Sequence, residues 1–474
     1  MIYYELENQK LIGKKVETFL NPIKGFNVSK LLLFTLNKDW SIVINSFKDK
    51  CLIIPQIDAQ RLMAREEYIF NEDFMVPTED SRNLFEQIVK KDNTDKKLDL
   101  TTFILAITYS CNLRCTYCYQ QHTDKLRREN MTDEQLTNVL DIISKYRMDH
   151  PKEEIHIGLF GGEPLLYSTE NLIDKVFDFC KKNCLKVHIT TNGTHLNYYL
   201  KKIIINRSII SVINTTIDSV YCNEKTRTYL KSNVQNDDVH ANTAMEILKC
   251  SKTLLNYGVS VDISTNIDKH NKNELAKIHS FFKDSGFFEY NNFRWDIGRV
   301  DDRLFETNYP DILCEADILK ELENIAIPDP KMHAAFIKTG YNICNKIGKL
   351  YGQTELRGKY NYCWTSSAID KVFYIDNDLN VYRCTYSVGH REKSLFGFSK
   401  ENLNKYCLSN RSYLDYEQCF NCNLGGYCSG GCKLSFETDM NKQCEFEKES
   451  FRLLVEGVLK PYLKSKVDYL DIGE

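Results

Sequence analysis

The sequence lacks the features that would assign its 474 residues to a membrane or a secreted protein. It has no apolar run of the roughly 20 residues needed to span a bilayer. Its start, MIYYELENQK, lacks the basic and then apolar order of a signal peptide. Neither sign of charge is in excess, because 62 Lys and Arg residues nearly balance 65 Asp and Glu residues. We therefore expect a cytoplasmic protein with no membrane partner and no nucleic-acid partner.

Length and composition predict more than one hydrophobic core. Hydrophobic residues make up 42% of the 474 positions, and a single core rarely grows beyond about 250 to 300 residues. The charged, turn-rich segment KKDNTDKK at residues 90–97 marks one expected boundary, and a second is expected within residues 301–360. We expect two or three domains.

Six apolar, β-branched runs of strand length follow residue 100. They lie at residues 103–108, 154–160, 186–191, 209–218, 259–268 and 293–298. Helical patterns separate several of them, and the first helix opens with a capping-box pair, Thr132 and Gln135. Strands that alternate with helices form parallel βαβ units, and six strands are fewer than the eight of a closed TIM barrel. The pattern predicts an α/β fold with a partial (β/α)6 TIM-like barrel.

Cysteine is abundant and unevenly distributed. The chain has 18 cysteines, and in a reducing cytosol such a number favours metal ligands or buried thiols over disulfides. Three lie within residues 111–118, and seven follow a second pattern between residues 363 and 444. Most of the others lie on apparent core faces and are interpreted as small buried hydrophobes. These are Cys51, Cys180, Cys184, Cys222, Cys250 and Cys314.

The first group, Cys111, Cys115 and Cys118, has CxxxCxxC spacing and directly follows the first predicted strand. Loops at this end of a barrel strand usually carry the chemistry. Three thiolates can hold one 4Fe–4S cube and leave its fourth iron without a protein ligand. The alternative is a structural zinc site, but zinc needs four closed ligands and His122 is the nearest fourth candidate.

This loop, CNLRCTYCY, resembles the signature of the radical S-adenosylmethionine (SAM) superfamily, CxxxCx(aromatic)C, with Tyr117 in the aromatic position. The resemblance implies that Cys111, Cys115 and Cys118 hold a catalytic 4Fe–4S cluster. It also implies that SAM binds the open iron beside Tyr117 and is cleaved to a 5′-deoxyadenosyl radical, which abstracts hydrogen from an unactivated carbon.

The segment GGEP, which ends the second predicted strand, resembles the loop that receives the methionine amino group of SAM in that superfamily. The glycines Gly161 and Gly162 allow close backbone approach, and Glu163 offers an acceptor for an ammonium group. An ordinary turn is the alternative interpretation.

The next two strands end in TTNGT and TTID, where the superfamily also places polar side chains. By this resemblance Asn192, Thr216 and Asp218 contact the ribose or carboxylate of SAM. Capping between strand and helix is an equally good explanation of these three residues. The fifth strand departs from the family, because Ser264 stands where relatives often have Arg. Arg227 and Arg299 are both candidates to replace that cation.

The second group of cysteines resembles the seven-cysteine SPASM domain, which holds two auxiliary 4Fe–4S clusters. Its members are Cys363, Cys384, Cys419, Cys422, Cys428, Cys432 and Cys444. The turn glycine usually found before the second of them is replaced by Leu379, with Asn377 and Asp378 available for turn chemistry. Two zinc ribbons are the alternative.

Carried over position by position, the resemblance divides these ligands between two clusters. The second auxiliary cluster takes Cys419, Cys422, Cys428 and Cys444. The first takes Cys363, Cys384 and Cys432 and is one ligand short. Cys344 or Cys407 is a candidate fourth ligand, and an open iron for a substrate is the other possibility.

The resemblance implies five regions. They are an N-terminal α+β module (1–97), a radical SAM partial barrel (98–310), a bridging region (311–362), a SPASM domain (363–450) and a C-terminal helix (451–474). In the N-terminal module KLLLFTLNKDWSIVI suggests one or two strands and DSRNLFEQIVKK a helix. In many peptide-modifying relatives such a module binds a precursor leader by strand addition; a packing extension of the barrel is the alternative.

The expected function is that of a peptide maturase, similar to sactipeptide and ranthipeptide thioether synthases. Such an enzyme uses SAM and three 4Fe–4S clusters to form a thioether or carbon–carbon crosslink in a precursor peptide, with electrons from a flavodoxin or ferredoxin type of donor. One alternative is an anaerobic sulfatase-maturating oxidase, whose usual QFIP-like segment is replaced here by NNFRWDIGRV. A non-enzymatic iron–sulfur electron carrier is the other, although it would need neither GGEP nor a barrel.

Overall fold

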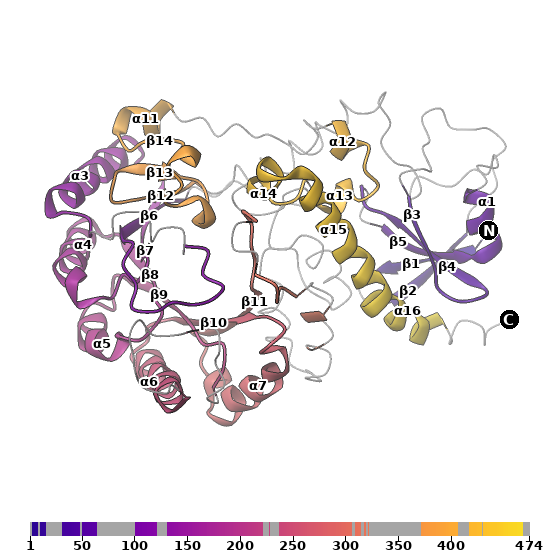
Figure 1. Ribbon diagram of the computed structural model, residues 1–474, viewed down its shortest axis with the longest axis horizontal. Coiled ribbons are helices and arrows are strands. Elements are labelled where there is room, and N and C mark those ends of the chain that lie inside the picture. Colours follow the sequence, from indigo (N-terminus) through magenta and orange to yellow (C-terminus); the bar gives the residue numbers. More distant parts are fainter. Residues whose placement is uncertain are drawn as a thin grey trace.

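The computed structural model describes residues 2–7, 10–15, 31–47, 50–63, 100–120, 130–220, 227, 237–305, 309–313, 317–318, 321, 371–405, 417–428 and 430–467. These residues form one sheet of five strands and one of nine. Figure 1 shows the larger sheet and its helices at one end of the molecule, the smaller sheet at the other, and the C-terminal helices between them.

Six parallel strands of the larger sheet confirm the predicted partial barrel. They are β6 (Leu100–Thr108), β7 (Glu154–Gly161), β8 (Lys186–Thr190), β9 (Ile210–Thr216), β10 (Val261–Ile267) and β11 (Phe293–Arg299). Each strand pairs in parallel with the next one along the chain. The carboxyl ends of all six strands therefore lie at the same edge, where the loops that carry chemistry are found in such folds.

Helices between the strands cover the outer face of this sheet (Figure 1). They are α3 (Asp133–Asp149), α4 (Glu170–Asn183), α5 (Leu196–Ile205), α6 (Asp237–Asn256) and α7 (Leu275–Asp284), with 3₁₀ turns at Tyr167–Thr169, Lys272–Glu274 and Phe287–Glu289. The predicted capping box is present: the Thr132 hydroxyl accepts from the Gln135 amide at 3.1 Å, and the Gln135 side chain accepts from the Thr132 amide at 2.7 Å. Alternate strand residues such as Ile157 and Leu159 share one buried core with the helices.

A hairpin far along the chain extends this sheet beyond its first strand. β12 (Lys371–Ile375) pairs in parallel with β6, and β13 (Asn380–Tyr382) and β14 (Phe396–Gly397) follow antiparallel. The sheet order is therefore β11-β10-β9-β8-β7-β6-β12-β13-β14. The segment expected to begin a separate SPASM domain is thus continuous with the barrel sheet.

The turn between β12 and β13 explains how this chain manages without the usual glycine. Leu379 takes the left-handed conformation at φ 61°, which is costly for a residue with a branched side chain. The Asp376 carboxylate accepts hydrogen bonds from the amides of Asp378 at 3.0 Å and Asn380 at 2.8 Å. Asp376 therefore supplies the turn chemistry that was expected from Asn377 and Asp378.

The C-terminal part consists of short helices and one longer helix. They are the 3₁₀ turns Thr385–Ser387 and Arg391–Lys393, α11 (Lys400–Lys405), α12 (Glu417–Phe420), α13 (Gly425–Cys428), α14 (Lys433–Thr438), α15 (Met440–Leu454), a π-helical turn (Val455–Leu459) and α16 (Lys460–Val467). The helix expected over residues 451–474 is therefore the continuation of a helix that begins at Met440.

The N-terminal module is an antiparallel sheet of order β2-β1-β5-β4-β3 with one short helix. Its elements are β1 (Ile2–Glu7), β2 (Lys10–Lys15), β3 (Leu32–Thr35), β4 (Trp40–Asn45), β5 (Lys50–Pro55) and α1 (Gln56–Met63). β3 and β4 confirm the strands predicted in KLLLFTLNKDWSIVI, whereas the helix predicted in DSRNLFEQIVKK lies outside the described residues.

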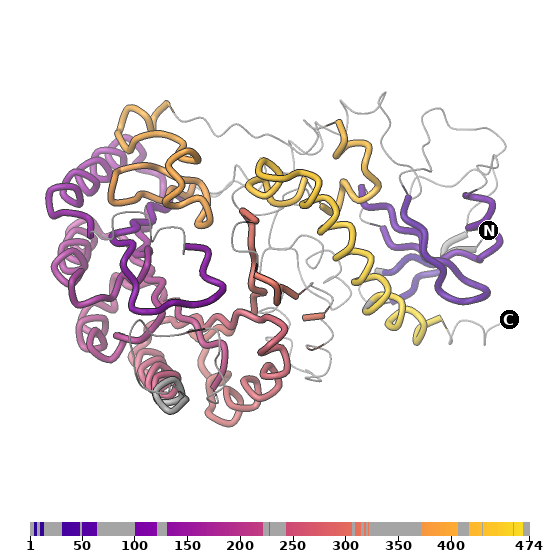
Figure 2. The backbone as a smooth tube through the Cα atoms, viewed as in Figure 1, coloured from indigo at the N-terminus to yellow at the C-terminus, as the bar shows by residue number. Residues whose placement is uncertain are grey.

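The described part of this module packs on the C-terminal helices. Ile42, Ile44 and Ile53 share a buried cluster with Phe451 and Leu454 of α15. Figure 2 shows the indigo N-terminal strands beside the yellow C-terminal helix at one end of the molecule, with the orange β12–β14 segment against the barrel at the other. This cluster joins the two ends of the sequence.

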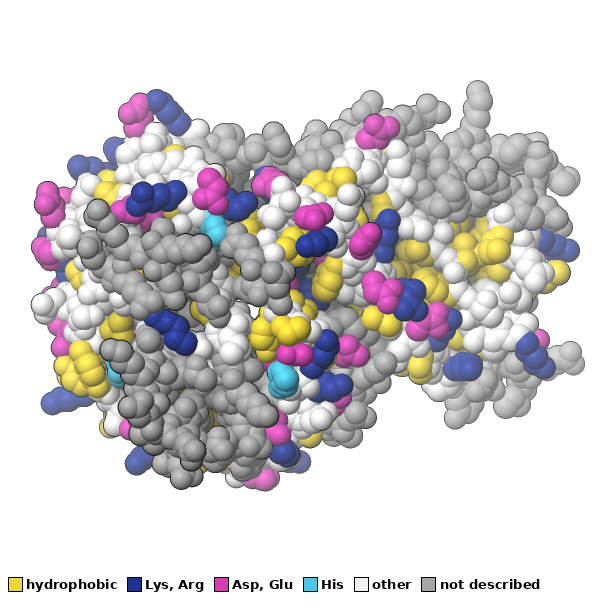
Figure 3. Space-filling view, viewed as in Figure 1, with side chains coloured by type: hydrophobic (Ala, Val, Ile, Leu, Met, Phe, Trp, Pro, Cys, Tyr) yellow, Lys and Arg dark blue, Asp and Glu magenta, His cyan; other side chains and the backbone are white. Residues whose placement is uncertain are grey.

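Among the described residues no helix has the length and apolar character required to cross a bilayer. On the face shown in Figure 3, basic and acidic side chains are interspersed over the barrel and the C-terminal helices. This mixture agrees with the balance of charge in the whole sequence.

Candidate functional site

The loop that carries Cys111, Cys115 and Cys118 follows β6 at the carboxyl edge of the sheet. A turn bond from the Cys118 amide to the Cys115 carbonyl, 3.1 Å, folds the loop back on itself. Burial is the main cause that raises the pKa of the Cys111 thiol to about 11 and that of Cys115 to about 12, and the charge of the Cys118 thiol contributes to both values. The three thiols therefore lie within electrostatic reach of one another, and a cationic group would have to displace their protons.

A single zinc ion is the alternative to an iron–sulfur cube at these thiols. In the described ranges, no three His, Cys, Asp or Glu side chains converge closely enough to hold one metal ion. A cube holds each thiolate on a different iron, so its ligands lie farther apart than those of a mononuclear site. His122, the candidate fourth zinc ligand, lies outside the described residues.

The glycines of GGEP are required because this segment packs directly beneath the cysteine loop. The Gly162 amide donates to the Thr108 carbonyl at 2.8 Å, and the Glu163 amide donates to the Ser110 carbonyl at 2.9 Å. A Cβ atom at Gly161 or Gly162 would overlap these two carbonyl oxygens. Only glycine permits this close approach. The approach fixes the position of the cysteine loop relative to the end of β7.

Glu163 is fully buried and its carboxylate is engaged by the protein itself. It accepts hydrogen bonds from the Leu165 amide at 2.8 Å, the Thr191 hydroxyl at 2.6 Å and the Asn192 amide at 2.6 Å. Burial raises the pKa of Glu163, while these hydrogen bonds and the charge of Arg227 oppose the shift. The Glu163 side chain was expected to accept a hydrogen bond from a ligand ammonium group. In the structure its hydrogen bonds connect the residues that follow β7 with those that follow β8.

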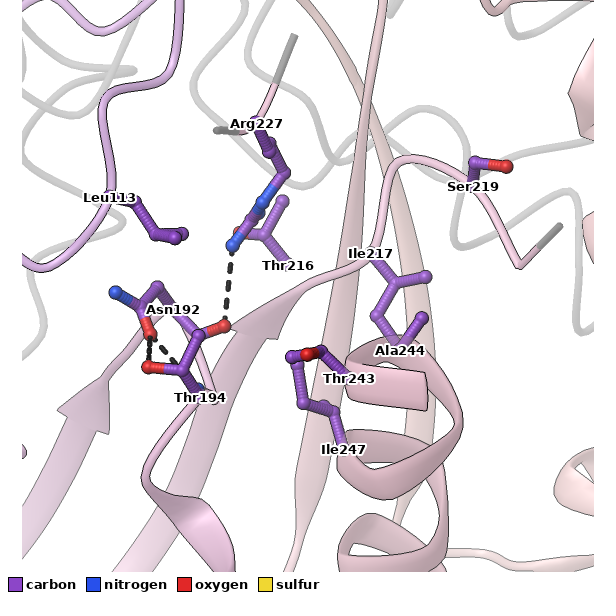
Figure 4. Close-up of a pocket in the computed structure, with 10 residues that line it drawn as sticks. All are labelled: Leu113, Asn192, Thr194, Thr216, Ile217, Ser219, Arg227, Thr243, Ala244 and Ile247. Atoms are coloured by element: carbon purple, nitrogen blue, oxygen red, sulfur yellow. Dashed lines mark hydrogen bonds between the residues drawn. The ribbon is translucent and has the colours of Figure 1, made fainter. Parts of the chain in front are cut away.

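Asn192 connects the cysteine loop to a pocket. Its side-chain amide donates to the Asn112 carbonyl oxygen at 2.8 Å and approaches the Cys111 sulfur at 3.7 Å. Its side-chain oxygen, Oδ1, accepts from the backbone amide and the hydroxyl of Thr194, at 2.9 and 2.7 Å (Figure 4). Asn112 and Thr194, which sequence reasoning missed, are thus the residues that orient Asn192. Asn112 could have been noticed in the sequence only as a polar residue inside the cysteine loop.

The pocket lies at the carboxyl ends of β8 and β9, against the first turns of α6. Its lining residues, drawn in Figure 4, are Leu113, Asn192, Thr194, Thr216, Ile217, Ser219, Arg227, Thr243, Ala244 and Ile247. Two of the three polar strand-end residues singled out in the sequence, Asn192 and Thr216, are therefore brought together here. The α6 residues had no sequence signal, because only tertiary packing places that helix over the pocket.

Asp218, the third of those residues, has a different position. Its buried carboxylate accepts a hydrogen bond from the Tyr117 hydroxyl and another from the Asn266 amide at 2.8 Å. Burial raises the pKa of both Tyr117 and Asp218. This pair ties the aromatic position of the cysteine loop to β9 and β10, so Asp218 supports the loop and is not among the residues that line the pocket.

The structure separates the two candidate arginines. Arg227 is buried, lines the pocket and donates to the Asn192 carbonyl at 3.2 Å (Figure 4). Arg299 instead lies 4.4 Å from the Phe446 ring and 3.6 Å from the Asp301 carboxylate, toward the C-terminal helices. Ser264 is paired with Thr216 in the strand register, beside the pocket. Of the two candidates, Arg227 is therefore the one that lies at the pocket.

Four cysteines of the C-terminal group come together. Burial raises the pKa of Cys419 to about 12 and raises those of Cys428 and Cys444, with further contributions from the thiols of this group, including Cys422. Each of these thiols acts electrostatically on at least one of the others. The set that the resemblance assigned to the second auxiliary cluster is thus one spatial group.

The other C-terminal cysteines are only partly described. Cys384 begins the 3₁₀ turn after β13, and Cys432 begins α14. Cys363, Cys344 and Cys407 lie outside the described residues, so the ligand set of the first auxiliary cluster stays a prediction.

The remaining cysteines divide by environment. Cys180 and Cys250 are buried as expected, and Cys51 is half-buried. The prediction for Cys184 was wrong, because it ends α4 in the left-handed conformation with its side chain exposed. Cys222 and Cys314 lie outside the described residues.

Comparison with known proteins agrees with this geometry. Residues 105–282 match the family described as "Radical SAM superfamily". The chain is 24% identical over 374 residues to the cysteine-type anaerobic sulfatase-maturating enzyme of Clostridium novyi, covering 74% of this chain and 94% of that protein. It is 26% identical over 396 residues to the radical SAM cyclopropyl synthase TigE of Paramaledivibacter caminithermalis, covering 75% and 73%.

Two solved structures have the same fold. Native anSMEcpe with bound AdoMet aligns with a TM-score of 0.56 and 18% identity, over 77% of this chain and 99% of that one. Streptococcus suis SuiB bound to precursor peptide SuiA aligns with a TM-score of 0.50 and 15% identity, over 88% and 97%. With the family match, the cysteine loop and the barrel, residues 105–282 of this chain form a radical SAM domain.

Proposed function

We propose that this radical SAM enzyme is a maturase that installs a thioether or carbon–carbon crosslink in a ribosomally made precursor peptide. The observation that supports it best is the junction at Asn192, which touches the Cys111 sulfur on one side and lines the pocket on the other. A cluster on the cysteine loop and a ligand in the pocket would therefore be neighbours.

The cysteine loop has the residues to hold the catalytic cluster, with Cys111, Cys115 and Cys118 as its three ligands. When bound, such a cluster supplies the electron that cleaves SAM to a 5′-deoxyadenosyl radical. The chain's own groups position and shield this chemistry. Glu163 holds Asn192 in place through its amide, and Tyr117 with Asp218 anchors the loop.

The pocket residues are suited to a zwitterionic amino-acid group. Arg227 offers a guanidinium for the methionine carboxylate, the interaction for which arginine geometry is best adapted. Asn192 and Thr216 add neutral donors and acceptors for the ribose or the amino group. Burial of Arg227 reduces the screening of its charge by water.

A peptide substrate is supported by the solved neighbours, one of which holds the precursor peptide SuiA and another of which, anSMEcpe, holds the Cp18Cys peptide. The C-terminal cysteine group supports chemistry beyond hydrogen abstraction, because auxiliary clusters can accept an electron or bind a substrate thiolate. We propose two auxiliary 4Fe–4S clusters there, a leader-binding role for residues 1–97, and a flavodoxin or ferredoxin type of electron donor.

A second candidate is the formation of formylglycine. The sulfatase-maturating relative is about as similar as the cyclopropyl synthase, at 24% against 26% identity. The two reactions differ in sulfur balance: crosslinking removes two hydrogens and keeps the sulfur, whereas formylglycine formation replaces a cysteine thiol by an aldehyde. High-resolution mass spectrometry of a treated precursor peptide distinguishes them.

Replacement of Cys111, Cys115 and Cys118 together by Ala tests the catalytic assignment. Anaerobically reconstituted wild-type protein should hold about twelve irons, and the triple variant about eight with no 5′-deoxyadenosine released from SAM. Cys180→Ala, which removes a buried thiol outside both groups, is the control. A triple variant that still cleaves SAM would refute the assignment.

A further inference from the structure

The turn between β4 and β5 of the N-terminal sheet lies against the C-terminal cysteine group. Ser46 and Phe47 form this turn, and each is no more than 1% exposed. The Ser46 hydroxyl donates to the Asn423 carbonyl at 2.7 Å, which joins positions 377 residues apart. Asn423 is the residue directly after Cys422. The N-terminal module thus makes a specific polar contact inside the loop that carries the cysteines.

Two glycines in that loop lie against the turn, and Gly426 is the one that the turn backbone requires. A Cβ atom at Gly426 would overlap the Ser46 carbonyl oxygen and lie 2.6 Å from the Phe47 Cα atom. At Gly425 it would overlap the Cys419 carbonyl oxygen and lie 3.2 Å from the Phe47 ring. The obstructing atoms at Gly426 are backbone atoms, which cannot rotate away as a side chain can. The loop between Cys422 and Cys428 is therefore shaped around the N-terminal turn.

Apolar packing adds to the contact between the β4–β5 turn and the cysteine loop. The Phe47 ring lies 6.5 Å from the ring of fully buried Phe420, which follows Cys419, in an edge-to-face arrangement. Cys422 and Cys428 themselves pack against the buried cluster formed by the N-terminal sheet and α15. Figure 1 shows α13 and α15 beside that sheet. One side of the cysteine group is thus closed by residues from the other end of the chain.

We propose that the β4–β5 turn is a positioning element of the second auxiliary cluster: Ser46 and Phe47 hold the Cys419–Cys428 loop in its ligating shape and keep water from the cluster. This inference rests on the proposed assignment of Cys419, Cys422, Cys428 and Cys444 to that cluster. Solvent exposure and hydrogen bonding around the sulfurs set the reduction potential and stability of a cluster. The N-terminal module is then part of the redox site.

Two variants of the full-length, reconstituted protein test this role. Gly426→Ala should push the turn away, and Ser46→Ala should remove its hydrogen bond without adding bulk. We expect Gly426→Ala to lose about a third of its iron, one cluster of three. Ser46→Ala should keep its iron but shift the midpoint potential of one cluster in an EPR-monitored titration and lose that cluster faster in air.

Matched controls separate this effect from general damage. Gly397→Ala adds a methyl group where no atom lies within 4 Å, and Ser41→Ala removes a buried hydroxyl whose partner, Gln56, lies within the N-terminal module. Both controls should retain wild-type iron content and potentials. The cluster of Cys111, Cys115 and Cys118 should retain its EPR signal with SAM in every variant.

The outcomes distinguish this inference from the proposed function. Wild-type protein with about twelve irons that keeps all of them when Cys419 and Cys422 are both changed to Ala would overturn the ligand assignment itself. Wild-type protein with about twelve irons, together with Ser46→Ala and Gly426→Ala variants whose iron, potentials and air sensitivity match the controls, would overturn the role of the turn alone. If Ser46→Ala and Ser41→Ala lost the auxiliary cluster equally fast in air, the role of the turn would also be overturned. The effect would then come from a less stable N-terminal sheet.

Discussion

At the residue scale, the carboxylate of Glu163 shows how a motif residue can act through its neighbours. It has two oxygens and accepts three hydrogen bonds from Leu165, Thr191 and Asn192. A ligand ammonium could use only the acceptor capacity that remains. We therefore expect Glu163 to affect SAM binding mainly through the position in which it holds Asn192.

We expect Glu163→Gln to lower the free energy of unfolding of the ligand-free protein by about 1–3 kcal/mol, because the NH2 group would replace one carboxylate oxygen and face at least one of the three donors. Because burial raises the folded-state pKa of Glu163, its contribution is present below the unfolded pKa and lost as pH rises through the folded value. The variant should lack this pH dependence in urea unfolding. Glu134→Gln, on the exposed first turn of α3, is the control. Unchanged stability with weakened SAM binding would instead favour a direct contact between Glu163 and SAM.

Arg227 is the residue for which a change should affect ligand binding most directly. We expect Arg227→Gln to weaken SAM binding by about 1.5–3 kcal/mol, roughly tenfold or more in Kd, because a charge-assisted hydrogen bond to the carboxylate would be lost. Iron content should not change. Anaerobic calorimetry measures the affinity, with Arg207→Gln on the exposed end of α5 as control. Equal affinities for wild-type and variant proteins would remove Arg227 from the SAM site.

At the scale of elements, β12 is held on the barrel by a partly buried polar junction. Glu153 accepts hydrogen bonds from the Thr101 hydroxyl at 2.6 Å, the Tyr146 hydroxyl at 2.9 Å and the Lys371 ammonium. Burial alone would raise the pKa of Glu153, but the hydrogen bonds from Lys371, Thr101 and Tyr146 outweigh it and lower the pKa. The ionised carboxylate is the form that fastens β12 to β6 and α3.

Glu153→Gln should therefore lower the unfolding free energy by about 1–2 kcal/mol near neutral pH. The expected loss is modest because Lys371 is partly solvated, which weakens its ion pair with Glu153. The wild-type contribution is present above the unfolded pKa and is lost as pH falls through the lowered folded pKa. Unfolding of wild-type and variant proteins is measured from neutral pH down to pH values below the pKa of a free glutamate. The difference in unfolding free energy between them should shrink over this range. Glu154→Gln, beside it on the surface, is the control. A constant difference at every pH would contradict this assignment.

At the scale of the whole molecule, one question concerns how the first auxiliary cluster is completed. In the proposed assignment, Cys363, Cys384 and Cys432 leave this cluster one ligand short. If a substrate cysteine occupies the open iron, its sulfur is held beside the carbon radical, and thioether formation becomes an intramolecular step. If Cys344 or Cys407 closes the cluster, only electron transfer remains for it.

We expect Cys344→Ala and Cys407→Ala each to keep about twelve irons and full activity. A cysteine-containing precursor peptide should then perturb the EPR spectrum of one auxiliary cluster, and the same peptide with Ser in place of Cys should not. Loss of a cluster in either variant would show a closed site and exclude ligation of the substrate sulfur.

Local pattern was sufficient for much of this molecule. Apolar, β-branched runs of strand length identified β6 to β11 to within a few residues, and the pair Thr132 and Gln135 marked the start of α3, because these signals depend on neighbours in the sequence. The cysteine spacing likewise pointed to a cluster, since a short loop fixes how far apart its thiols lie. Strand-end polarity selected Asn192 and Thr216 for the pocket.

Only the tertiary structure decided the rest, because it depends on contacts between distant residues. No local pattern distinguishes Arg227 from Arg299, yet the first lines the pocket and the second packs on Phe446. None shows that Glu163 is engaged by Thr191, or that β12 pairs with β6. The contact of Ser46 with Asn423 spans 377 positions, and it exists because folding buries the N-terminal sheet against the C-terminal helices.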